Sequence, residues 1–150
     1  MENGIREAAL ALTLRSKFVY VTTLDEGFPE TRVMFNRLKH RAKALSSGSA
    51  KVPRDFATYL GTNTSSRKVA QMRKDDRVCL YYSDNGSFEG CMVRGRVREV
   101  GDAAVRGDVW TDSWNMYYRG GLEGGDFSLM LFVPESVRYY HGLKVTVFEA

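Results

Sequence analysis

The pair Asn85-Gly86 separates two segments rich in β-branched and aromatic residues, at 77–82 and 87–100. Asn-Gly is the sequence most typical of a two-residue hairpin turn, because both residues tolerate a positive φ. Such a turn sets the register of an antiparallel pair, and therefore which side chains share a face. We expect one apolar face on which Val78 lies opposite Val93 and Leu80 lies opposite Cys91, with Cys79 opposite Met92 on the other face.

Further strand patterns surround this hairpin. β-Branched and aromatic runs predict strands over 17–24, 31–38, 55–61, 127–133, 136–140 and 143–148. The residues Asp25-Glu26-Gly27 supply a turn between the first two, which makes a second hairpin. Alternation within it puts Val33 and Phe35 on one side and Arg32, Met34 and Asn36 on the other.

Three helices are expected between and before the strands. Apolar residues at three- and four-residue steps predict a helix over 2–15, and a second begins at Arg67. The cluster Thr62 to Ser66 precedes that start, and its side chains are expected to accept from the first free backbone N–H groups. A third helix is expected over 102–119, ended by Gly120-Gly121. No linker or repeat divides the chain, so the sequence predicts one domain over 1–150. This domain is mainly β (α+β), a small antiparallel β-barrel with peripheral helices.

Composition excludes several classes of protein. The chain is 43% hydrophobic but has no apolar run near the roughly 20 residues that a membrane span needs, so we expect a cytoplasmic protein with no membrane partner. Cys79 and Cys91 are too few for a disulfide framework, and neither they nor His40 and His141 have a metal-ligand spacing. The formal net charge of +4 favours an anionic partner: a phosphate-bearing cofactor, nucleic acid or an acidic surface.

The segment TNTSSRK at 62–68 is the first candidate for chemistry. It lies where a strand is expected to end and a helix to begin, and such a helix start presents free N–H groups. Hydroxyl side chains and adjacent Arg and Lys complete a phosphate site. The alternative is an ordinary helix cap with solvated charges.

Basic and aromatic residues elsewhere are weaker candidates. Arg32 could pair with an anion across the sheet, or lie exposed on a solvated strand. A stripe of Arg94, Arg96 and Arg98 could follow a nucleic-acid backbone, but a solvated outer face is the expected reading. The basic residues of 37–54 are read as a flexible loop, and Trp110, Trp114 and Tyr117 as core aromatics.

The order of these segments resembles the pyridoxamine 5'-phosphate oxidase-like flavoproteins. The resemblance runs from KFVYVTTLDEGFPETRVM through FATYLGTNTSSRKVAQM, RVCLYYSD and MVRGRVREV to LFVPESVRYYHG, and is closest to a short branch similar to the general stress protein 26 group. It implies a split β-barrel that forms a homodimer, with FMN in two equivalent clefts at the subunit interface. FAD, F420 and haem are the alternative cofactors.

The resemblance also implies a set of cofactor-binding residues. One part is a strand whose arginine reaches the FMN phosphate or ribityl chain and whose backbone lies along the isoalloxazine ring. A second part is the pair at the end of the third strand together with a phosphate grip, and a third is an aromatic side chain near the flavin of the other subunit. In this sequence the three parts match Arg32 with Val33, Met34 and Phe35; Thr62 and Asn63 with Ser66, Arg67 and Lys68; and Trp114 or Tyr117.

A flavin carries the redox chemistry itself, so no catalytic side chain is needed or identified. We expect an FMN-dependent oxidoreductase that moves hydride or electrons between a reduced nucleotide and an unidentified small molecule. A non-catalytic flavin- or ligand-binding protein for storage or sensing is the second reading, and a basic barrel that binds RNA is the third. True pyridoxamine phosphate oxidases close with a basic, histidine-containing segment that has no counterpart here, so that substrate is not expected.

Overall fold

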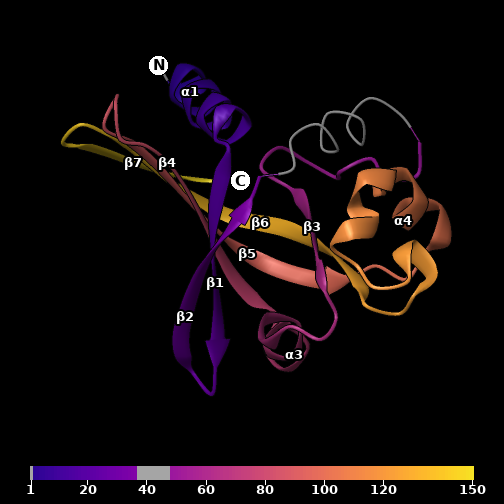
Figure 1. The fold of residues 1–150 in the computed structure, drawn as a ribbon. Coiled ribbons are helices and arrows are strands. Elements are labelled where there is room, and N and C mark those ends of the chain that lie inside the picture. Colours follow the sequence, from indigo (N-terminus) through magenta and orange to yellow (C-terminus); the bar gives the residue numbers. More distant parts are fainter. Residues whose placement is uncertain (1, 37–47) are drawn as a thin grey trace.

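The computed structural model describes residues 2–36 and 48–150, and antiparallel strands make up most of this part of the chain (Figure 1). The strands are β1 (Phe18–Asp25), β2 (Phe28–Phe35), β3 (Thr58–Asn63), β4 (Arg77–Asp84), β5 (Glu89–Glu99), β6 (Phe127–His141) and β7 (Lys144–Glu149). The helices are α1 (Glu2–Arg15), α3 (Arg67–Lys74) and α4 (Ala103–Val109), with short 3-10 segments η1 (Asp112–Met116) and η2 (Gly121–Glu123). None of the described helices is long and apolar enough to cross a bilayer.

All strands belong to one sheet in the order β2-β1-β4-β5-β6-β3, with β7 added to β6. Every pairing is antiparallel. The sheet curls around one core, to which β1, β3, β4, β5 and β6 all contribute buried side chains together with α1 and α3. Its end strands β2 and β3 do not pair with each other, so the barrel is open along this line.

The hairpin of β1 and β2 is confirmed, with a two-residue turn at Glu26 and Gly27 in which both φ values are positive (52° and 84°). The second strand begins at Phe28, three residues earlier than expected. Its expected alternation is confirmed, because Arg32 and Met34 are half-buried while Val33 and Phe35 are exposed.

The predicted register of β4 and β5 is wrong by two residues. Leu80 lies opposite Val93 rather than Cys91, because four residues, 85–88, connect the strands. The Asp84 carboxylate widens this connection by accepting from the backbone N–H groups of Gly86 and Ser87. A shift of two preserves the face of every side chain, so the apolar face is as expected and Cys91 is buried. Both cysteines are free.

Two further element boundaries differ from expectation. The segments 127–133 and 136–140 form a single strand, β6, which carries Pro134 at a register shift opposite Gly95. A bulge accommodates proline because the residue there need not donate to the ladder. The strand expected over 55–61 begins only at Thr58.

The single helix expected over 102–119 is also wrong. Helix α4 ends at Val109, Trp110 is extended, and η1 follows. The break allows Trp110 and Trp114 to pack on the Phe127 ring, with centroid distances of 5.1 and 6.0 Å. Together with Tyr118 these rings form the centre of a second core, between α4, η1 and β6. The tryptophans at helical spacing are therefore core residues, and a broken helix packs them better than a continuous one.

Candidate functional site

Arg32 is held inside a polar network between the β1–β2 hairpin and α3. Its Nη1 donates to the backbone oxygens of Val21 (3.2 Å) and Glu30 (3.0 Å) and to Thr23 Oγ1 (2.7 Å). Its Nη2 donates to Gln71 Oε1 at 3.0 Å. The side chain is only 24% exposed, and burial lowers the pKa of the guanidinium. Arg32 is therefore a fixed, partly buried cation and not a solvated strand residue.

Arg67 lies at the other end of the same network. Its Nε and Nη2 hold the Glu30 carboxylate in a two-pronged contact at 3.0 and 2.8 Å, and Nη2 also donates to Asp25 at 2.8 Å. Hydrogen bonds from Arg67 and then from Gln71 lower the pKa of Glu30 to about 2. Arg67 is thus brought close to Arg32 as expected, but its charge is already matched by carboxylates.

Ser66 and Lys68 differ from Arg67, because in the described part of the chain the Ser66 hydroxyl has no hydrogen-bond partner and no carboxylate offsets the charge of Lys68. Ser66 is the N-cap residue of α3, yet its side chain caps no N–H group, so the capping expected of it is wrong. Its Oγ is the one buried side-chain polar atom of the described residues that has no hydrogen-bond partner. Burial, and then the charge of Arg32, lowers the pKa of Lys68. Within residues 2–36 and 48–150, no carboxylate opposes this shift.

The segment 62–66 is positioned by the start of β6 instead. The Asp126 carboxylate accepts from Ser65 N at 3.0 Å and from Asn63 Nδ2 at 2.9 Å, and Thr64 Oγ1 lies 2.7 Å from Ser128 Oγ. None of these hydrogen bonds involves the Ser66 hydroxyl. Asp126 was not identified from the sequence, because it lies more than 60 residues away along the chain.

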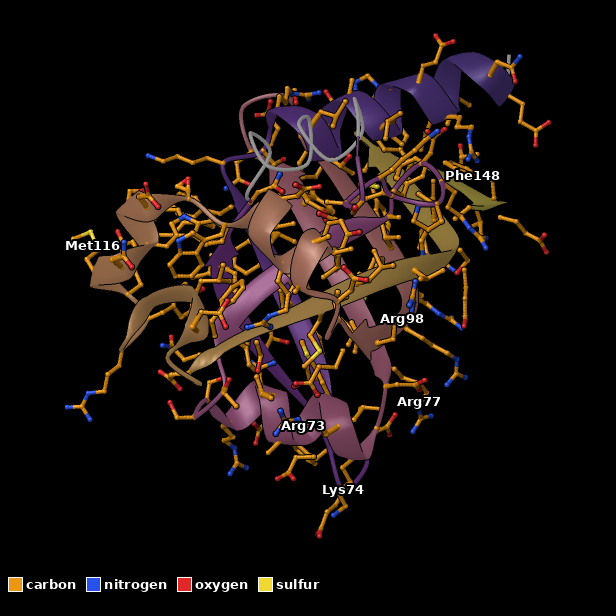
Figure 2. All side chains as sticks on the ribbon, turned by 90° about the vertical axis from the view of Figure 1, so that its right-hand side faces the viewer. Arg73, Lys74, Arg77, Arg98, Met116 and Phe148 are labelled. Atoms are coloured by element: carbon orange, nitrogen blue, oxygen red, sulfur yellow. The ribbon has the colours of Figure 1, made fainter. Side chains whose placement is uncertain are left out.

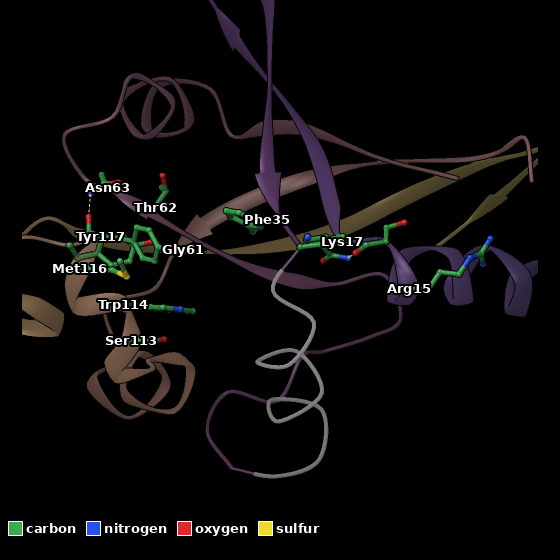
Figure 3. Close-up of a pocket in the computed structure, with 13 residues that line it drawn as sticks. Arg15, Lys17, Phe35, Gly61, Thr62, Asn63, Ser113, Trp114, Met116 and Tyr117 are labelled. Atoms are coloured by element: carbon green, nitrogen blue, oxygen red, sulfur yellow. Dashed lines mark hydrogen bonds between the residues drawn. The ribbon is translucent and has the colours of Figure 1, made fainter. Parts of the chain in front are cut away.

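A cavity of about 620 Å³ lies beyond this cluster, where the ends of β2 and β3 meet η1 (Figure 3). Four of the residues expected at the cofactor line it: Phe35, Thr62, Asn63 and Trp114. Tyr117, the alternative to Trp114, lines it as well. Figure 3 shows Trp114, Met116 and Tyr117 on one side of the cavity and Lys17 on the other. The sequence pattern did not single out Lys17 or Met116, because neither belongs to a recognisable local motif.

Val33 and Met34 lie outside this cavity. Val33 is exposed on the outer face of the sheet, and Met34 packs against the core, where it lines the narrow gap between β2 and β3. Arg32 and Phe35 are three residues apart on β2, or about 10 Å. Because β2 is an end strand, one edge of its backbone faces no other strand in the described part of the chain. That edge runs from the cationic cluster, which consists of Arg32, Arg67 and Lys68, to Phe35 at the cavity.

The basic stripe on β5 lies on the outer face of the sheet, and one of its arginines is paired with carboxylates. Arg94, Arg96 and Arg98 are exposed on one face as expected, and Arg96 forms ion pairs with Asp76 (2.7 Å) and Glu135 (3.0 Å). Figure 2 shows Arg98 and Arg77 on the opposite side of the molecule from Met116. The part of the basic loop at 37–47 lies outside the described residues, which hold no group of side chains suited to a metal ion.

Comparisons with known proteins agree with this architecture. Residues 34–148 match a family model described as "Pyridoxamine 5'-phosphate oxidase like". Among curated proteins, no sequence matches the chain.

Solved structures give the same indication. A protein from Clostridium acetobutylicum related to general stress protein 26 of B. subtilis (pyridoxinephosphate oxidase family) is 29% identical, with a TM-score of 0.74 over 99% of this chain and 96% of that one. General stress protein 26 from Bacillus anthracis is 14% identical, with a TM-score of 0.69 over 95% and 98%. A haem-binding protein from Mycobacterium smegmatis is 14% identical, with a TM-score of 0.68 over 97% and 57%. The last two likenesses concern the fold alone.

Proposed function

The chain belongs to the pyridoxamine 5'-phosphate oxidase-like family, and from this membership we propose that it is an FMN-binding oxidoreductase. Its phosphate grip consists of Arg32, Ser66 and Lys68. The observation that carries the proposal is the buried Ser66 hydroxyl without a partner, at the start of α3 and beside Lys68. A buried hydroxyl without a hydrogen bond costs free energy, which a phosphate oxygen at this place would recover.

The charges of the cluster suit a phosphate monoester. Arg32 and Lys68 are both partly buried. Burial lowers the pKa of each, and like charge adds to this, from Arg67 on Arg32 and from Arg32 on Lys68. An anion between them would relieve both penalties. Glu30 and Asp25 already take up the charge of Arg67, so we assign Arg67 to the support of the grip rather than to phosphate contact.

The cavity at the ends of β2 and β3 is the place for the small-molecule substrate. Its volume of about 620 Å³ is typical of small-molecule sites, and its walls include the exposed side chains of Phe35, Met116 and Tyr117. FMN, when bound, supplies hydride and electron transfer. The protein's part is to hold the phosphate end at the cationic cluster, to keep the open edge of β2 along the cofactor, and to admit a small molecule at the cavity.

A homodimer is part of the same proposal. One cross-strand row on the outer face of the sheet carries mostly apolar side chains: Val33, Tyr20, Tyr81, Met92, Arg138 and Val147. Val33, Tyr20 and Val147 are 54%, 44% and 57% exposed. Apolar surface of this extent is typical of an interaction site, and a second copy that packs on this row would cover it.

FAD, F420 and haem are the alternative cofactors to be tested. The Mycobacterium smegmatis relative of this fold binds haem by its name. His141, the histidine among the described residues, does not line the cavity, so it supports no haem ligation there. FAD differs from FMN in mass, and F420 differs from it in both mass and absorption.

The test is to purify the protein, record its absorption spectrum and identify the released cofactor by mass. The flavin-free protein is then titrated with FMN and with riboflavin, which lacks the phosphate. Replacement Lys68→Gln should weaken FMN about 10- to 100-fold, since a hydrogen bond to an ionised group contributes about 1.5–3 kcal/mol, and should leave riboflavin unchanged. Lys74→Gln, on the same helix and paired with Glu26, is the control.

Equal losses for both ligands with Lys68→Gln would contradict the grip. Reduction of the bound flavin by NADH or NADPH, followed by reoxidation by an acceptor, distinguishes an oxidoreductase from a storage or sensing protein. Absence of any reduction would favour the second reading.

A further inference from the structure

Gln71 is a buried polar residue of α3, 4% exposed, and it contacts Arg32 directly. Its Oε1 accepts from Thr23 Oγ1 and from Arg32 Nη2, and its Nε2 donates to Glu30 at 2.6 Å. Helix α3 lies beside the β1–β2 hairpin that carries these partners (Figure 1).

The partners allow the Gln71 amide only one orientation. A flipped amide would direct its NH₂ group at the N–H donors of Arg32 and its oxygen at the Glu30 carboxylate, which can only accept. Glu30 is itself held by two contacts from Arg67. The pair Arg67–Glu30 therefore fixes the amide of Gln71, and Gln71 in turn fixes Arg32.

The donors of Arg32 can be counted. A guanidinium has five N–H donors. The three acceptors at Nη1 occupy both of its N–H groups, and Gln71 takes one N–H group of Nη2. Among the described residues no acceptor hydrogen-bonds to Nε, and the nearer Glu30 oxygen lies 3.8 Å from Nη2. Nε and the second N–H of Nη2 remain as a two-pronged donor, the geometry that matches phosphate.

We propose that Gln71 is a positioning residue for the cofactor phosphate, because it holds Arg32 with this two-pronged donor free. The inference rests on the proposed function and extends it to a residue that touches no cofactor. Without the amide, Arg32 Nη2 is free to move the short distance to the Glu30 carboxylate. The guanidinium then forms an ion pair with Glu30 instead of with phosphate.

The experiment compares FMN with riboflavin on the flavin-free protein, by quenching of flavin fluorescence. Gln71→Met keeps the length of the side chain and removes the amide. We expect the ratio of FMN to riboflavin affinity to fall about tenfold, with riboflavin affinity unchanged. Gln71→Ala, which leaves room for water, should give the same fall and serves if the first variant does not fold. Met72→Val, a buried neighbour on α3 outside the network, should leave the ratio unchanged.

A double-mutant cycle then asks whether Gln71 acts through Arg32. In the Arg32→Met background, adding Gln71→Met should change the ratio no further. A further fall, or an equal loss of FMN and riboflavin with Gln71→Met alone, would overturn the inference. Failure of the unaltered protein to prefer FMN over riboflavin would instead overturn the proposed function, so the two failures are distinguishable.

Discussion

Asn63 and Tyr117 are joined at the edge of the cavity, where Asn63 Nδ2 donates to the backbone oxygen of Tyr117 at 2.9 Å (Figure 3). The same amide group donates to Asp126 at 2.9 Å. A side chain at the end of β3 thus ties the end of η1 to the start of β6. The cavity wall is therefore set by a contact between segments 54 residues apart in the sequence.

This contact predicts how Asn63 variants behave. Asn63→Ala removes two hydrogen bonds, which we expect to lower the free energy of unfolding by about 1–3 kcal/mol. Asn63→Asp should cost more, because it places a second carboxylate against Asp126. Urea unfolding followed by tryptophan fluorescence measures both. Equal stability of the two variants would contradict the role of Asp126 as the acceptor.

Arg32 offers a graded test of the phosphate grip. Arg32→Lys keeps the charge but loses the two-pronged geometry, and Arg32→Met loses both, so FMN affinity should fall in the order Arg, Lys, Met. Flavin-free Arg32→Met should also lose about 1–3 kcal/mol of stability, because acceptors such as Gln71 Oε1 lose their donor. Fluorescence titration and urea unfolding supply the two readouts. Affinities alike within about 0.5 kcal/mol would remove Arg32 from the site.

Glu30 should make the free energy of unfolding depend on pH in the acidic range. Its folded-state pKa of about 2 lies below the ordinary value of 4.5, so its contribution is complete above pH 4.5 and is lost as the pH falls toward 2. Glu30→Gln should flatten the decline of the unfolding temperature in that window. Asp75, whose pKa Arg77 lowers to about 2, should behave in the same way with Asp75→Asn. Curves of the variants that run parallel to that of the unaltered protein would contradict these assignments.

The proposed homodimer depends on the apolar row across the outer face of the sheet. A charge at Tyr20, on that row, should separate the subunits, because a buried unpaired carboxylate is costly. We expect Tyr20→Asp to sediment as a monomer at micromolar concentration and to bind FMN weakly. Phe28→Asp changes a more exposed aromatic residue on the other face of the hairpin and should leave the dimer intact. A monomeric unaltered protein with flavin bound would refute the shared cleft.

Gly95 is predicted to be intolerant of any side chain. A Cβ there would lie 2.2 Å from the Val133 backbone oxygen and 2.9 Å from Pro134 Cα, at the register shift between β5 and β6. Gly95→Ala should therefore lower the free energy of unfolding by about 1–3 kcal/mol or more. Gly101→Ala, where nothing lies within 4 Å, is the matched control and should be neutral. Similar denaturation midpoints for the Gly95→Ala and Gly101→Ala variants would contradict this prediction, because they would mean that β5 and β6 move apart enough to admit the Cβ.

Local patterns in the sequence determined most of the strands and their faces. Alternation along β2 and along 77–100 assigned Arg32, Leu80, Val93 and Cys91 to the faces that they occupy. The TNTSSRK segment marked the start of α3 correctly. These features depend on residues a few positions apart, which is why a single sequence carries them. The length of the turn between β4 and β5 could not be predicted from these local patterns. The Asp84 carboxylate accepts from the backbone there and widens a connection that Asn-Gly alone would make with two residues.

Tertiary structure decided the state of each candidate site residue. Ser66, Arg67 and Lys68 are neighbours in the sequence, yet one has an unpartnered buried hydroxyl, one is paired with Glu30 and Asp25, and one is a half-buried cation. Whether the Arg67 charge is paired depends on Glu30 and Asp25, which lie 37 and 42 residues away in the sequence, and burial depends on how the whole chain packs. The broken helix at Trp110 has the same origin, because packing of two tryptophans on Phe127 outweighs helix propensity. The sequence by itself thus indicated the strand and the helix start that carry Arg32, Ser66 and Lys68, and only the folded chain decided which polar and charged groups there are paired and which are not.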